Sequence, residues 1–217
     1  MLKDKTLLKI CGITTVDQAL QIAEFGVDAI GIISVKESPR YVTTEKKMEI
    51  FESLYKFFPK TQRVSVIQNL PLETIFENLS DYKYEDVVQL HGEEDLNYCK
   101  KLKDYLPNLN LWKAFRIKNK IDIEKISLYE KFVDAVLLDS WNQDIYGGSG
   151  MRIKSEILKG LKINKQWWLA GGVSIDWIEY ILKDIKPDGI DISSSIEIYP
   201  GTKDIKKAEK IIKAIKK

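Results

Sequence analysis

Eight short apolar runs alternate with eight longer amphipathic runs along the 217 residues of this chain. The apolar runs are rich in β-branched residues and lack a clean alternation, as expected for strands buried on both faces of a parallel sheet. The amphipathic runs between them have the apolar spacing of helices that cover such a sheet. Eight strand–helix pairs in a chain of this length predict a single (β/α)8 TIM barrel.

The predicted barrel spans residues 1–217 as one domain, because no linker, low-complexity tract or block of charge marks a boundary. The predicted strands cover residues 7–11, 28–34, 63–68, 86–92, 111–117, 134–140, 167–173 and 188–194. The predicted helices cover residues 15–26, 43–58, 71–80, 93–106, 122–131, 153–161, 174–185 and 203–216. An open doubly wound sheet is the alternative, but it seldom needs eight units, and no GxGxxG motif follows the first strand.

Composition argues against several classes of partner. The net charge of +2 is near balance, so it predicts binding neither to nucleic acid nor to an acidic membrane surface. No run of about 18 apolar residues is present, and the first residues lack the apolar segment of a signal peptide. With only two cysteines, Cys11 and Cys99, we expect a cytoplasmic protein in a reducing environment rather than a disulfide scaffold. None of these features indicates an oligomeric state.

Reactive side chains leave several predicted strands at their C-terminal ends, where the loops of a TIM barrel carry the chemistry. Cys11 ends the first strand in LLKICGIT, and Asp139 lies at the end of the sixth in AVLLDS. A thiolate can accept a proton if its pKa is lowered from about 8.5, and a carboxyl can donate one if burial raises its pKa from about 3.9. From the residues alone, a small buried hydrophobe is the more usual role for such a cysteine, and Asp139 also fits a turn residue.

Two loops of small residues follow the seventh and eighth predicted strands, where barrels of this kind often hold phosphate. The segment AGGVS contains Gly171 and Gly172, and the segment DISSS contains Asp191, Ser193 and Ser194. Glycines let backbone N–H groups approach an anion closely, and serine hydroxyls can donate as well. Either loop alone fits an ordinary tight turn, but together on neighbouring strands they predict phosphate binding.

Arginine is scarce in this lysine-rich chain, so each arginine carries some information. Four of the 34 basic residues are arginines, namely Arg40, Arg63, Arg116 and Arg152. Arg40 follows the second predicted strand at the rim of the barrel, where its planar fork would suit a carboxylate better than lysine would. A surface salt bridge explains the same position equally well.

Six segments together resemble the phosphoribosylanthranilate isomerase family of tryptophan biosynthesis. They are KICGIT, SPRY, VVQLHG, LLDS…YGGSG, LAGGV and GIDISSSIE…PGTKD, and they occur in order from residue 9 to about residue 204. KICGIT and SSxxE…PGxKD are rather specific to that family. The resemblance implies a (β/α)8 barrel that works without a cofactor. The implied reaction is the Amadori rearrangement of N-(5-phosphoribosyl)anthranilate to 1-(2-carboxyphenylamino)-1-deoxyribulose 5-phosphate.

The resemblance also implies roles for residues at matching positions. Cys11, the cysteine of KICG, would be the general base, and Asp139, the aspartate of LLD, would be the general acid. Arg40 would bind the anthranilate carboxylate, and Asp191 would contact the sugar hydroxyls. The phosphate would be held by small residues of the last two loops, namely Gly171, Gly172, Ser193 and Ser194. The expected partner is thus a small phosphorylated substrate. No metal is expected, because one histidine and two distant cysteines cannot build a tetrahedral shell without several carboxylates.

Further expectations concern three single residues and one loop. Members of that family usually read SSG after the eighth strand, whereas this chain has Ser195, and a positive φ there would cost of order 1 kcal/mol or more. His91 is a candidate for catalysis, but the QLHG turn is mostly scaffold in that family, so we favour a structural role. Cys99 is expected to be an inert core residue of a helix. The loop 140–151 is expected to be a mobile cover over the substrate, with a simple turn as the alternative.

Three rival interpretations remain. The related histidine-pathway isomerase would require an aspartate in place of Cys11, and indole-glycerol-phosphate synthase would require lysine and glutamate on early strands, so neither matches. A catalytically silent phosphate-binding barrel is favoured only by the serine at position 195.

Overall fold

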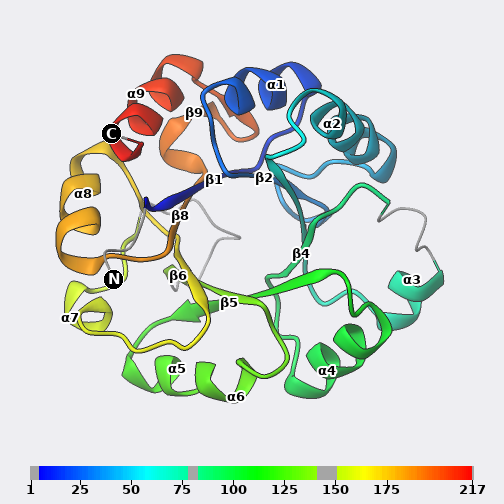
Figure 1. The fold of residues 1–217 in the computed structure, drawn as a ribbon, viewed down its shortest axis with the longest axis vertical. Coiled ribbons are helices and arrows are strands. Elements are labelled where there is room, and N and C mark those ends of the chain that lie inside the picture. The colour runs from blue at the N-terminus through cyan, green and yellow to red at the C-terminus, as the bar shows by residue number, and fades with distance from the viewer. Residues whose placement is uncertain (1–4, 78–82, 141–150, 217) are drawn as a thin grey trace.

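A closed barrel of eight parallel strands, ringed by helices, makes up the part of the chain that the computed structural model describes, residues 5–77, 83–140 and 151–216 (Figure 1). The predicted (β/α)8 fold is therefore confirmed. The barrel strands are β1 (Leu7–Cys11), β2 (Ala29–Ile33), β3 (Gln62–Ile67), β4 (Val87–Leu90), β5 (Asn110–Ile117), β6 (Ala135–Ser140), β7 (Gln166–Leu169) and β8 (Gly189–Ile192). The helices are α1 (Val16–Glu24), α2 (Thr44–Phe57), α3 (Leu72–Glu77), α4 (Leu96–Tyr105), α5 (Lys120–Glu124), α6 (Ile126–Tyr129), α7 (Ser155–Leu158), α8 (Ile175–Tyr180) and α9 (Ile205–Ile215).

The strands follow one another round the barrel in sequence order, and each runs parallel to its neighbours. Closure occurs between β1 and β8, where Leu7 is in register with Gly189 and Lys9 with Asp191. Parallel closure brings the C-terminal ends of all eight strands to one face of the barrel. Residues that are far apart in the sequence therefore meet at that face.

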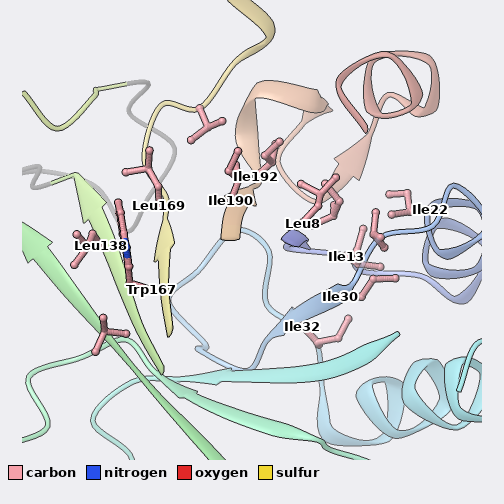
Figure 2. Packing of buried hydrophobic residues seen from close by; sticks show 14 of the residues in the cluster. Leu8, Ile13, Ile22, Ile30, Ile32, Leu138, Trp167, Leu169, Ile190 and Ile192 are labelled. Atoms are coloured by element: carbon pink, nitrogen blue, oxygen red, sulfur yellow. The ribbon is translucent and has the colours of Figure 1, made fainter. Parts of the chain in front are cut away.

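One apolar layer lies between the barrel and the helices. Strand residues such as Leu8 and Ile30 face α1, which contributes Ile22 to the same layer (Figure 2). On the opposite side of the barrel, Leu138 and Leu169 belong to the same layer. Each fully buried aliphatic side chain of this kind contributes roughly 1.5–3 kcal/mol of transfer free energy, so this layer supplies much of the stability of the fold.

A second apolar cluster fills the inside of the barrel. Trp112 of β5 and Trp168 of β7 pack there with their ring centroids 4.8 Å apart. The Trp168 ring needs the glycine opposite it, because a Cβ on Gly189 would lie 2.2 Å from a ring carbon. These aromatic rings pack inside the barrel below the face where the strands end, so the polar residues of that face lie above an apolar cluster.

The structure departs from the predicted elements in four places. The predicted helix 122–131 is divided into α5 and α6 by a turn at Lys125, and the predicted helix 153–161 is reduced to the four residues of α7. Helix α8 continues as a π-helical turn, η2 (Ile181–Ile185). After β8, a 3₁₀ turn, η3 (Ser194–Ile196), leads into an antiparallel hairpin of β9 (Glu197–Tyr199) and β10 (Thr202–Lys203), which was not predicted. No helix within the described ranges is long and apolar enough to span a membrane.

Candidate active site

A cavity opens at the C-terminal ends of the barrel strands and, together with the open solvent at its mouth, spans about 1050 Å³. Its lining includes all eight residues that the sequence predicts for the site, namely Cys11, Arg40, Asp139, Gly171, Gly172, Asp191, Ser193 and Ser194. The structure thus brings the predicted residues together, while their individual roles stay predictions.

Cys11 points into the barrel at the end of β1 and is buried, with 6% of its surface exposed. Burial raises the pKa of the Cys11 thiol above its usual value, although the positive charge of Lys9 acts in the opposite direction. The predicted role as a general base would require the thiolate, which this burial opposes and the charge of Lys9 favours.

Asp139 is held at the cavity from two sides. Its Oδ1 accepts a hydrogen bond from the backbone N–H of Ser140 at 2.8 Å, and its Oδ2 lies 3.2 Å from Nε2 of His91. The other ring nitrogen of His91 lies 3.0 Å from the amide nitrogen of Gln89. A Cβ on Gly171 would lie 2.7 Å from Oδ1 of Asp139, so only glycine lets the two loops approach this closely. The contact between His91 and Asp139 was not anticipated from the sequence, which favoured a purely structural histidine.

Arg40 does form a bidentate pair with a carboxylate, but its partner belongs to the protein. Its Nε and Nη2 lie 2.8 Å and 2.6 Å from the two carboxylate oxygens of Glu197 in β9. Lys203 of β10 also contacts Glu197, at 2.8 Å. Burial acts to raise the pKa of Glu197, but the hydrogen bonds from Arg40 and the charge of Lys203 outweigh it and hold that pKa below its usual range. Among the described residues Nη1 of Arg40 donates to no acceptor, and Arg40 lines the cavity.

The two small-residue loops have the geometry of an anion site. Gly171 and Gly172 both have positive φ, +79° and +61°. Within the described residues their backbone N–H groups donate to no acceptor, so both are available to a ligand. Lys203 donates to the carbonyl of Ser193 at 3.1 Å and so fixes the second loop. Ser195 is not among the described residues with positive φ, so the strain considered for this serine does not arise.

Asp191 contacts a residue that the sequence analysis did not identify. Its Oδ2 lies 2.9 Å from Nζ of Lys9, and the Lys9 side chain is fully buried. The remaining oxygen, Oδ1, is buried and has no hydrogen-bond partner among the described residues. Burial raises the pKa of Asp191, while Lys9 acts to lower it.

The sequence analysis assigned no role to several residues that the structure places at the site. Lys9 and Glu197 belong to the quoted segments KICGIT and SSxxE, and Arg116 lies within a strand, but no chemistry was assigned to these residues. A signal existed for Lys9, because a lysine inside the otherwise apolar run LLKIC has to be paired if it is buried. Arg116, at the end of β5, lines the cavity and has no ion-pair partner in the described part of the chain.

Two remaining expectations concern residues away from the cavity or outside the described ranges. Cys99 is fully buried in α4, which confirms its predicted place in the core, and burial raises its pKa to about 12. The predicted cover, 140–151, lies outside the described residues apart from its first and last positions. Among the described residues, no group of three or more histidine, cysteine, aspartate or glutamate side chains is arranged to hold a metal ion.

Comparison with known proteins identifies close relatives over nearly the whole length. A family model described as N-(5'phosphoribosyl)anthranilate (PRA) isomerase matches residues 8–214. The N-(5'-phosphoribosyl)anthranilate isomerase of Petrotoga mobilis is 40% identical over 208 residues, which cover 96% of each chain. The crystal structure of phosphoribosyl anthranilate isomerase from Thermotoga maritima is similar with a TM-score of 0.85 at 30% identity, covering 97% of this chain and 98% of that one. A phosphoribosyl anthranilate isomerase in complex with reduced 1-(o-carboxyphenylamino)-1-deoxyribulose 5-phosphate has a TM-score of 0.81 at 30% identity, with the same coverage.

Proposed function

The chain belongs to the N-(5'-phosphoribosyl)anthranilate isomerase family and is an isomerase of tryptophan biosynthesis, and within that activity we propose that Cys11 is the general base and Asp139 the general acid. The substrate is N-(5-phosphoribosyl)anthranilate, and the product is 1-(2-carboxyphenylamino)-1-deoxyribulose 5-phosphate. The observation that carries the proposal is that Cys11 and Asp139 line one cavity together with the two loops suited to phosphate.

The reaction needs two proton transfers at different atoms of one sugar. Asp139 in its acid form protonates the furanose ring oxygen, the bond from that oxygen to C1′ breaks, and the sugar opens to a Schiff base with the anthranilate nitrogen. The Cys11 thiolate then removes the proton from C2′, and the electrons of that bond form the enolamine. The enolamine tautomerises to the ketone. Each positioned acid or base of this kind contributes about 10²–10⁴-fold to the rate.

The two charged ends of the substrate fix the position of the reacting carbons. The N–H groups of Gly171 and Gly172, with Ser193 and Ser194, hold the phosphate, and Arg40 receives the anthranilate carboxylate at its free nitrogen. Asp191 contacts the sugar hydroxyls. Anchoring both ends converts the chemistry into an intramolecular step, which accounts for a large part of the acceleration in such enzymes. The complex of a similar isomerase with a reduced phosphorylated product supports a ligand of this class.

His91 assists Asp139 rather than acting on the substrate. An imidazole 3.2 Å from Oδ2 can hold the carboxyl in one orientation. After each turnover Cys11 releases the proton taken from C2′ and Asp139 takes one up, which restores both groups. The amide of Gln89 orients the ring from the other side. We count His91 as a positioning residue, so its replacement should reduce turnover less than the replacement of Asp139.

The test compares turnover with binding in single variants. Cys11→Ala and Asp139→Asn should each lower turnover, followed by anthranilate fluorescence, by at least about 10²-fold. Both should bind the reduced product analogue within a few-fold of the unmodified protein, because neither residue anchors the phosphate or the carboxylate. Cys99→Ala is the matched control for loss of a thiol, and its turnover should be unchanged.

Near-normal turnover in Cys11→Ala or in Asp139→Asn would overturn the assigned roles. If the unmodified protein binds the analogue but does not turn over the substrate, the catalytically silent interpretation is correct instead.

A further inference from the structure

A fully buried lysine lies directly beneath the proposed general base. Lys9 and Cys11 are two residues apart on β1, so both side chains point into the barrel. The Nζ atom of Lys9 lies 2.9 Å from Oδ2 of Asp191, and its positive charge also acts on the Cys11 thiol, lowering the pKa of that thiol. The rearrangement described above does not use Lys9, although a buried ammonium is costly to maintain.

The neighbouring strand leaves room for this contact. A Cβ placed on Gly31 of β2 would lie 2.8 Å from the Cys11 sulfur and 3.1 Å from Nζ of Lys9. The missing side chain therefore leaves the space beside which both the sulfur and the ammonium lie in the barrel interior. The contact is built from three strands, because Asp191 approaches from β8 on the other side.

Lys9, Cys11 and Asp191 form one buried group, and its charge balance constrains which of the three side chains are protonated. Lys9 carries one positive charge, and Cys11 and Asp191 can each carry one negative charge. With Lys9 protonated, the group is neutral when one of the two acids holds a proton. A second buried negative charge would lack a partner within the group, and an unpaired buried charge is strongly unfavourable.

We propose that Cys11 and Asp191 share a single proton across the Lys9 ammonium, so that Lys9 is the positioning residue that makes the Cys11 thiolate accessible. The proposal rests on the assignment of Cys11 as general base. In the transfer the S–H bond of Cys11 breaks, an O–H bond forms on Asp191, and Lys9 remains an ammonium. The thiolate is thus formed without changing the net charge of the group.

Two further features support this exchange. Oδ1 of Asp191 has no hydrogen-bond partner among the described residues, so it is free to carry the proton. Burial acts to lower the pKa of Lys9, but the charges of Asp191 and Cys11 outweigh it and raise that pKa above its ordinary value, which keeps Lys9 protonated. The pKa values of both acids are raised, mainly by burial, as expected for two groups that compete for one proton.

Charged groups from other elements act on the same exchange. Lys203 of β10 favours the Cys11 thiolate, since its positive charge lowers the pKa of the thiol. Asp139 of β6 favours protonation of Asp191, whereas His91, which follows β4, opposes it. Lys203 and Asp139 therefore both favour the arrangement with the thiolate and the neutral carboxyl.

The test measures the protonation of Cys11 directly and does not depend on turnover. The rate of alkylation of Cys11 by iodoacetamide is followed from pH 6 to pH 10 by peptide mass spectrometry, with buried Cys99 as an internal reference. Asp191→Asn removes the competing negative charge, so Cys11 should be alkylated at least tenfold faster at neutral pH. Lys9→Met removes the positive charge, so alkylation of Cys11 should be at least tenfold slower. The midpoint of the pH dependence of the alkylation rate should also rise.

Lys47→Met is the matched control, because Lys47 is an equally buried lysine that pairs with Glu85 outside the cavity. This variant should leave the alkylation profile of Cys11 unchanged. Unchanged profiles in both Asp191→Asn and Lys9→Met would overturn the shared proton, and so would slower alkylation in Asp191→Asn. If Lys9→Met does not fold, Asp191→Asn still decides the question, because the shared proton requires faster alkylation of Cys11 in that variant.

Failure of this proposal is distinguishable from failure of the proposed function. If Cys11→Ala is inactive but alkylation does not respond to Asp191 or Lys9, only the shared proton is wrong. If Cys11→Ala retains turnover, the general base has been misassigned, whatever the alkylation profiles show.

Discussion

Replacing Glu197 with alanine removes the carboxylate that joins two buried cations at the rim of the barrel. Glu197 is 5% exposed as a side chain, Arg40 is 6% exposed and Lys203 is fully buried. The carboxylate accepts from both cations and also from the backbone N–H of Gly201 at 3.2 Å. Its removal leaves two positive charges close together in a water-poor setting, where each had a counter-charge before.

The expected cost follows from this geometry. Removing one partner of a buried ion pair typically costs about 3–5 kcal/mol, because the remaining charge stays desolvated. With two cations affected, we expect Glu197→Ala to lower the free energy of unfolding by about 4 kcal/mol or more. For a chain of this length that corresponds to a fall of about 8–16 °C in Tm. Glu197→Gln keeps the shape and one acceptor, so its effect should be smaller.

The assay is urea unfolding of both variants beside a matched control. Glu49→Ala breaks the pair between Glu49 and Lys46, which is 2.7 Å long but has side chains 57% and 41% exposed. That change should cost less than about 1 kcal/mol. A cost for Glu197→Ala no greater than that for Glu49→Ala would refute the reasoning.

The contacts of Glu197 with Arg40 and Lys203 also predict how the stability of the protein depends on pH. Because Arg40 and Lys203 hold the pKa of Glu197 below its usual range, the folded state binds a proton there less readily than the unfolded chain does. The stabilisation is therefore complete above the ordinary glutamate pKa of about 4.3 and is lost as pH falls through the lower folded-state value. The stability difference between the unmodified protein and Glu197→Gln should narrow over that acidic range. A stability difference that stays constant with pH would contradict the assignment of this stabilisation to the ionised Glu197 carboxylate.

Two further predictions test individual contacts of the site, and a third tests a contact on the protein surface. Gly31→Ala places a Cβ 2.8 Å from the Cys11 sulfur. The change should therefore lower kcat and cost about 1–3 kcal/mol of stability. An unchanged kcat would contradict the close packing of Gly31 against Cys11. Gly171→Ala combines a φ of +79° with a Cβ 2.7 Å from the Asp139 carboxylate, so kcat should fall and KM should rise together, whereas a change in stability alone would contradict its place in the site. Hydrogen bonds from a neighbouring serine and arginine lower the pKa of Asp176 to about 2. In an NMR titration its carboxylate should still be ionised at about pH 3, and a midpoint at the ordinary aspartate value of about 3.9 would contradict those bonds.

The barrel was predictable because its evidence is local and repeated. Each apolar run and each amphipathic run indicates its own element, and eight such pairs leave few other architectures. The ends of the strands were also informative, since Cys11 and Asp139 lie where an apolar run gives way to a turn. Knowing that all such ends meet at one face was enough to place them in one cavity.

The pairing of side chains across the barrel was not predictable in the same way. Lys9 and Asp191 are 182 residues apart and meet only because β1 and β8 close the barrel in that register. Strands buried on both faces lack the alternation of apolar and polar residues that would show which side chains point inward. The sequence therefore did not show that the Lys9 side chain points into the barrel. Likewise, Glu197 reaches Arg40 only through the β9–β10 hairpin, which is too short to have a clear sequence pattern.

The most direct measurement is a crystal structure of this protein with the reduced product analogue bound. In that complex the Cys11 sulfur should lie within about 3–3.5 Å of C2′ on one face of the sugar chain. The Asp139 carboxyl should lie within about 2.6–3.2 Å of the hydroxyl oxygen that derives from the furanose ring. The phosphate should lie on the N–H groups of Gly171 and Gly172. A ligand with its phosphate elsewhere, or with either reacting atom out of reach of its assigned residue, would contradict the account.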